Sequence, residues 1–107
     1  MDALINKICK GNSAYELIIR KSLQLYQQNK TMTFRELIDF LNSKGIYRYS
    51  TSIGISRGAI MEIFRRSINE YRNYDKVGNL DKKDKADKIC EAVAVSITRN
   101  NGVVAWL

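Results

Sequence analysis

The sequence predicts one mostly α-helical domain of four to five helices that ends in a short strand or a hairpin. Three observations lead to this fold class. Apolar residues recur at helical spacing in separate segments along the chain. Two of these segments begin with the capping pattern S/T-x-x-E. The 107 residues, of which 45% are hydrophobic and 27% charged, suffice for one core and are too few for two.

The N-terminal part of the chain predicts two helices. Asp2 is expected to cap a short helix whose apolar face holds Leu4, Ile5, Ile8 and Cys9, with Gly11 ending it. Ser13 and Glu16 form a capping box that begins a second helix, which runs to about Gln28. Its apolar surface is wide, as in a helix at the centre of a core or one that also meets a second subunit.

The third predicted helix runs from Phe34 to Lys44. Thr33 and Glu36 form a capping box at its start, and Gly45 is expected to end it in a left-handed conformation. The next residues, 46–52, fit either a short strand with alternating tyrosines or a brief helix, and the sequence leaves both open.

The fourth predicted helix runs from about Arg57 to Arg72, with Ser56 as its N-cap. Its apolar residues share one face because they recur three and four positions apart. They are Ile60, Ile63, Phe64, Ser67, Ile68 and Tyr71. After it, the segment from Asn73 to Leu80 loses this periodicity and predicts a loop.

A last helix is predicted from Asp81 through Ile97 towards Asn100, with Gly102 after its end, followed by a short strand or docked tail. The competing interpretation is a hairpin that pairs residues 95–99 with 103–107 across the Asn101-Gly102 turn. Trp106 is expected to fill the core in either case.

Basic charge is concentrated around the fourth helix. The chain has 18 Lys and Arg against 11 Asp and Glu, a formal charge of +7, and a pI near 9.6. Residues 44–72 contain six basic and two acidic residues, whereas residues 76–107 contain six and four. This excess of positive charge predicts an anionic partner. Nucleic acid is the first candidate and a membrane surface the second.

A line of residues on the fourth helix points away from its apolar face. This outer stripe consists of Gly58, Met61, Arg65, Asn69 and Arg72. Arginine offers donors that match phosphate and guanine edges, asparagine can pair with adenine, and glycine permits close approach. The pattern is typical of a helix that reads DNA.

The segment from Ile53 to Ile60 resembles the turn and recognition-helix start of helix-turn-helix proteins, with Gly54 as the turn glycine. In this alignment Tyr49, Ile53, Ile55, Ile60 and Ile63 occupy the apolar positions of the motif. A second alignment takes residues 34–44 as the scaffold helix and 46–55 as a long turn, similar to the helix-turn-helix of large serine recombinases without their catalytic domain. The match departs from the common pattern at Ser50 and in the acidic Glu62 and Glu70.

The resemblance implies a small DNA-binding transcriptional regulator, winged if the C-terminal hairpin forms. The candidate DNA-binding residues are Lys44, Arg48, Ser56, Arg57, Gly58, Met61, Arg65, Arg66, Asn69 and Arg72. Arg57, Arg65 and Asn69 would meet base edges, and Lys44, Arg48, Arg66 and Arg72 would meet phosphates. The expected partner is double-stranded DNA. A homodimer is common in this class, although no residue here decides it.

Other classes of function have less support in the sequence. The chain has no histidine and only two cysteines, Cys9 and Cys90, so no enzyme activity, metal site or cofactor is expected. Both cysteines are expected to be reduced thiols, and no signal peptide or membrane span is evident, which indicates a cytoplasmic protein. The alternative is an adaptor or inhibitor that binds an acidic host protein, with the tyrosines and arginines as interface anchors. Exposure of Tyr26, Phe40 and Trp106 together on one patch would favour it.

Overall fold

The structure, a computed structural model, describes residues 1–51 and 53–102, without the side chains of residues 51 and 53–56. Within these ranges the chain forms five α-helices, one 3₁₀ helix and two short strands, so the mostly α-helical fold class is confirmed. The elements are α1 (Asp2–Cys9), α2 (Ser13–Gln27), β1 (Met32–Thr33), α3 (Phe34–Ser43), η1 (Arg48–Thr51), α4 (Ile53–Lys76), α5 (Leu80–Ser96) and β2 (Ile97–Thr98).

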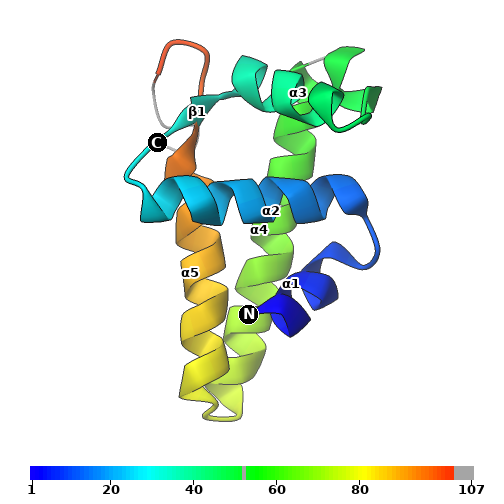
Figure 1. Ribbon diagram of the computed structural model, residues 1–107. Helices are drawn as coiled ribbons and strands as arrows, with labels where there is room; N and C mark the ends of the chain where they lie inside the picture. Colours follow the sequence, from blue (N-terminus) through cyan, green and yellow to red (C-terminus); the bar gives the residue numbers. More distant parts are fainter. Residues whose placement is uncertain (52, 103–107) are drawn as a thin grey trace.

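The two longest helices, α4 and α5, lie side by side and run in opposite directions (Figure 1). Helix α2 crosses both of them on one side, and α1 packs beside α2 against α4. Helix α3 lies near the N-terminal end of α4, with η1 between the two in sequence. Because α1, α2, α3 and α5 leave one side of α4 uncovered, the outer stripe faces outward.

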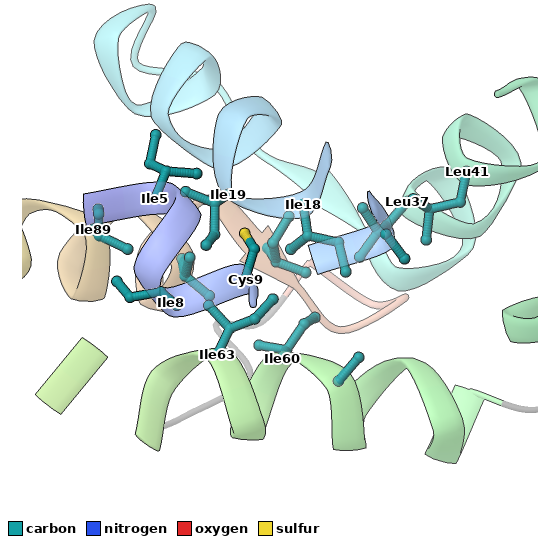
Figure 2. Packing of buried hydrophobic residues seen from close by; sticks show 14 of the residues in the cluster. Ile5, Ile8, Cys9, Ile18, Ile19, Leu37, Leu41, Ile60, Ile63 and Ile89 are labelled. Carbon is teal, nitrogen blue, oxygen red and sulfur yellow. The ribbon is translucent and has the colours of Figure 1, made fainter. Parts of the chain in front are cut away.

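The core collects side chains from all five helices (Figure 2). Ile8 and Cys9 of α1, together with residues of α2 and α3, lie over the inner face of α4. Ile60 and Ile63 of that face are fully buried, and Tyr49 of η1 is 3% exposed. Burial of branched aliphatic side chains provides the main favourable free energy of folding, about 1.5–3 kcal/mol for each complete side chain.

The predicted capping box of α3 is confirmed. The Thr33 hydroxyl accepts a hydrogen bond from the Glu36 amide at 3.2 Å, and the Glu36 carboxylate accepts one from the Thr33 amide at 3.1 Å. Gly45 follows the helix with φ of +83°, the left-handed conformation expected there.

The caps predicted for the first two helices are wrong. Asp2 is the first residue of α1 and makes no side-chain cap, since Met1 holds the N-cap position. The N-cap of α2 is Asn12, whose side-chain oxygen accepts from the Tyr15 amide at 3.1 Å, so Ser13 lies one residue inside the helix. Asparagine and serine are about equally good caps, and the sequence offers both in adjacent positions.

The predicted start of the fourth helix is wrong by one turn. Helix α4 begins at Ile53, so Gly54 is helical and makes no turn there, and Ser56 lies inside the helix instead of capping it. The scaffold helix of the second alignment corresponds to α3, although α4 begins inside the long turn which that alignment placed at residues 46–55. Residues 48–51 form the brief helix and not the strand.

The loop predicted from Asn73 to Leu80 is also wrong. Helix α4 continues to Lys76, and α5 starts at Leu80 after three connecting residues. Gly78 makes this short turn with φ of +72°, and the Asn79 side chain caps α5 by accepting from the Lys82 amide at 3.2 Å. The polar residues Asn73 and Asp75 are tolerated in the helix because they are exposed.

The last predicted helix ends earlier than expected, at Ser96. Ile97 and Thr98 instead form β2, which pairs in parallel with β1 in the register Met32 to Ile97 and Thr33 to Thr98. Val95 and Ser96 are helical, which contradicts a hairpin starting at residue 95. The partner strand of that hairpin and Trp106 lie outside the described residues.

Candidate nucleic-acid interface

The outer stripe of α4 forms an open, shallow surface. Each of its five residues is exposed, including Met61 with half of its side chain accessible. A hollow of about 440 Å³ runs along this side and is lined only by residues of α4 within the described part of the chain. The lining residues are Gly58, Met61, Glu62, Phe64, Arg65, Ile68, Asn69 and Arg72.

The opposite side of the helix holds the stripe in place. Ile60 and Ile63 are completely buried against the body, and the Ser67 hydroxyl is satisfied by donating to the Ile63 carbonyl at 2.8 Å. Residues at 3.6 per turn keep a fixed angular relation, so burial of these side chains forces Arg65 and Asn69 outward.

Further exposed cations lie before and at the start of α4. Lys44 follows α3, with its ammonium nitrogen 5.7 Å from the centre of the Phe40 ring. Arg48 lies in η1 with its guanidinium carbon 5.3 Å from the centre of the Tyr49 ring, and Arg57 is exposed in the second turn of α4. The side chain of Ser56 lies outside the described set.

Arg66 points towards the body of the protein, unlike the phosphate contact expected from the sequence. Its guanidinium donates to the Ile8 carbonyl at 2.9 Å and lies 5.1 Å from the centre of the Tyr15 ring. It also donates to Glu62 at 2.9 Å, and its side chain is only 23% exposed. Arg66 therefore joins α4 to α1 and α2.

Glu62 is the acidic residue of the candidate surface. Arg65 donates to it with two nitrogens, with Nε at 3.0 Å from Oε2, while Arg66 donates to Oε1, the oxygen that also accepts from Nη2 of Arg65. Hydrogen bonds from Arg65, opposed by partial desolvation and reinforced by Arg66, lower the pKa of Glu62 to about 2. The carboxylate is therefore ionised at neutral pH and offsets part of the local positive charge.

Two apolar members of the hollow were missed by sequence reasoning. Phe64 and Ile68 were assigned to the buried face, yet both are only half-buried and line the hollow next to Met61. The signal was available, because at 100° per residue these two positions lie at the edge of the apolar arc nearest to Met61. The surface is consequently a mixture of apolar and cationic groups.

Metal chemistry has no support in the described part of the chain, where no three His, Cys, Asp or Glu residues lie close enough to hold an ion. Cys9 and Cys90 are free thiols, and burial raises the pKa of each to about 11. Among the described helices, none is long and apolar enough to cross a membrane.

Comparison with known proteins gave no relative for this chain: no family model, no curated protein and no solved structure matches it.

Proposed function

We propose that this protein binds double-stranded DNA through the outer stripe of α4 and acts as a transcriptional regulator. The observation that carries the proposal is the exposure of Gly58, Met61, Arg65, Asn69 and Arg72 along one uncovered side of a long helix. The stripe is about 21 Å long at 1.5 Å per residue. An α-helix with such a side fits the width of the major groove of DNA.

Each part of the surface has a role in this proposal. Arg57, Arg65 and Asn69 would meet base edges, with Gly58 allowing the backbone to come close. Lys44, Arg48 and Arg72 would contact phosphates on either side of the groove. Arg66 is left out of the phosphate set, because its Nε and Nη1 already donate to Glu62 and Ile8 within the fold and its side chain is only 23% exposed.

In this proposal α3 and α4 act as the two helices of a helix-turn-helix unit, as in the second alignment. Helix α3 packs near the N-terminal part of α4, and the two are joined through a short 3₁₀ segment. In such motifs the first helix braces the second, and the second enters the groove. A homodimer would place two copies of α4 on successive half-sites. Sedimentation equilibrium can measure whether the protein is a monomer or a dimer.

The experiment is a gel shift with pooled genomic fragments at low and physiological salt. Wild-type binding should weaken as salt rises, because phosphate contacts release counterions. The variants Arg57→Ala and Asn69→Ala should bind about tenfold more weakly, a loss of ~1.4 kcal/mol. Lys88→Ala is the matched control, since Lys88 is an exposed cation of α5 away from the stripe.

Three results would contradict the proposal. They are no retention of DNA at low salt, an affinity that is independent of salt, and equal binding by Arg57→Ala, Asn69→Ala and Lys88→Ala. Circular dichroism of each variant would establish that a loss of binding does not come from unfolding.

The second candidate is a protein-binding adaptor, which the apolar residues Met61, Phe64 and Ile68 in the hollow favour. Two of the side chains whose joint exposure would favour it already have contacts within the fold. Tyr26 is half-buried beside Glu91, which raises the pKa of its hydroxyl through a hydrogen bond, and the half-buried Phe40 ring lies between Lys21 and Lys44. A basic adaptor would retain DNA only non-specifically, so Arg57→Ala, Asn69→Ala and Lys88→Ala would bind DNA equally, and the same gel shift separates the two candidates.

A further inference from the structure

Glu62 has two arginine partners that differ in how firmly they are held. Arg66 is anchored to the body through the Ile8 carbonyl and the Tyr15 ring. Arg65 is 61% exposed, and the only hydrogen bonds that the described residues give it run to Glu62. Glu62 therefore has one fixed partner and one that an external anion could take.

Arg65 is more easily separated from Glu62 than Arg66 is, because it is more exposed. An exposed ion pair contributes little to stability, so Arg65 can leave Glu62 at little cost. Glu62 would keep its bond to Arg66, at 2.9 Å, and would not become an unpaired charge. Any phosphate that approaches Arg65 nevertheless meets the negative charge of Glu62 in the same hollow.

We propose that Glu62 is a specificity-determining residue of the α4 surface, which competes with DNA phosphates for Arg65 and so weakens binding to the backbone of any sequence. A guanine edge carries only partial negative charge on its acceptors, so it must replace the Arg65 pair but is repelled less by the carboxylate than a phosphate is. Glu62 consequently disfavours phosphate contacts more than base contacts. This inference rests on the proposed DNA-binding function.

The test is Glu62→Gln, which removes the charge and keeps the size and an acceptor for Arg66. Asp84→Asn is the matched control, because it changes the net charge equally at an exposed position on α5. With a 20-bp duplex of random sequence, Glu62→Gln should bind about twofold to fivefold more tightly than Asp84→Asn. Its affinity should also fall more steeply with salt, by about one unit of the log–log slope.

A second measurement asks whether the gain depends on Arg65. In an Arg65→Ala background, the advantage of Glu62→Gln over Asp84→Asn should shrink to the part that comes from direct repulsion of phosphate, since the exposed cation for which Glu62 and phosphate compete is absent. The Glu62→Gln substitution should raise the affinity for a duplex selected for tight binding from a random pool less than it raises the affinity for the random duplex. The ratio of the two affinities, selected over random, should therefore fall. Thermal unfolding of each variant controls for changes in the fold.

The outcomes separate this inference from the proposed function. Equal affinities of Glu62→Gln and Asp84→Asn, or a gain that is equally large with and without Arg65, would overturn the role of Glu62 while leaving DNA binding intact. Loss of salt-dependent binding in the wild type, or no effect of Arg57→Ala, would overturn both.

Discussion

Adjacent residues of α4 have opposite surroundings. Arg65 and Arg66 are identical in type and differ by about 100° around the helix. One is mostly exposed at the hollow, whereas the other bonds to α1 and packs on a tyrosine of α2. Their charges alone could not distinguish them, because the distinction depends on which helix covers each side.

This difference predicts unequal effects on stability. Arg66→Ala should lower the free energy of unfolding by about 1–3 kcal/mol, because it removes a charged donor to a backbone carbonyl and its contact with Tyr15. Arg65→Ala should change it by less than about 1 kcal/mol, as for an exposed ion pair. Urea denaturation measures both, and equal losses would show that Arg66 does not join the helices.

The helices themselves could be predicted from sequence because their apolar spacing is clear, and the capping box and Gly45 also gave the two ends of α3. The ends of other helices could not be predicted. At the start of α2 and at the end of α4, neighbouring residues are about equally suited to begin or end the helix. Asn12 and Ser13 are both good caps, and the segment from Asn73 to Leu80 holds turn-forming residues although only three of its members leave the helical conformation. The structure selects among such options through tertiary contacts, such as the packing of Tyr71 and Tyr74 near Lys83 and Lys82 of α5.

The corrected cap of α2 gives a direct test. Asn12→Ala should lower the free energy of unfolding by about 1 kcal/mol, because the Tyr15 amide would lose its acceptor. Ser13→Ala, the neighbouring control, should cost less than about 0.5 kcal/mol. Thermal and urea unfolding would measure the two, and a larger loss at Ser13 would restore the cap expected from the sequence.

The candidate site could be predicted from sequence only in part. The outer stripe could be predicted because a 3.6-residue period fixes which side is opposite to the buried one. The inward direction of Arg66 could not be predicted, since it depends on where α1 and α2 lie against α4. The partial exposure of Phe64 and Ile68 could have been predicted from their place at the edge of the apolar arc.

At the scale of the whole molecule, the described residues share one core within extents of 41 × 27 × 22 Å. Residues of the first helix and of the last helix belong to the same cluster, from Leu4 to Ile97. Because α2 crosses both long helices, displacing it would expose the inner faces of α4 and α5 together (Figure 1). We expect unfolding to be cooperative.

The two thiols can test this cooperativity from opposite ends of the sequence. Cys9 in α1 and Cys90 in α5 both have a pKa raised to about 11 by burial, so at neutral pH both should react slowly with a thiol reagent in the native protein. Labelling followed by mass spectrometry across a urea series should give the same midpoint for both. A lower midpoint for Cys9 would mean that α1 detaches before the rest unfolds.

The parallel pairing of Met32 with Ile97 also bears on the order of folding. The helical hairpin of α4 and α5 needs only a three-residue connection. The pairing of β1 with β2 closes a loop of more than sixty residues, so its formation costs more chain entropy. We therefore expect this pairing to form after the helical hairpin during refolding. A nascent chain still lacking its last residues would then hold the long hairpin before α3 acquires its final orientation.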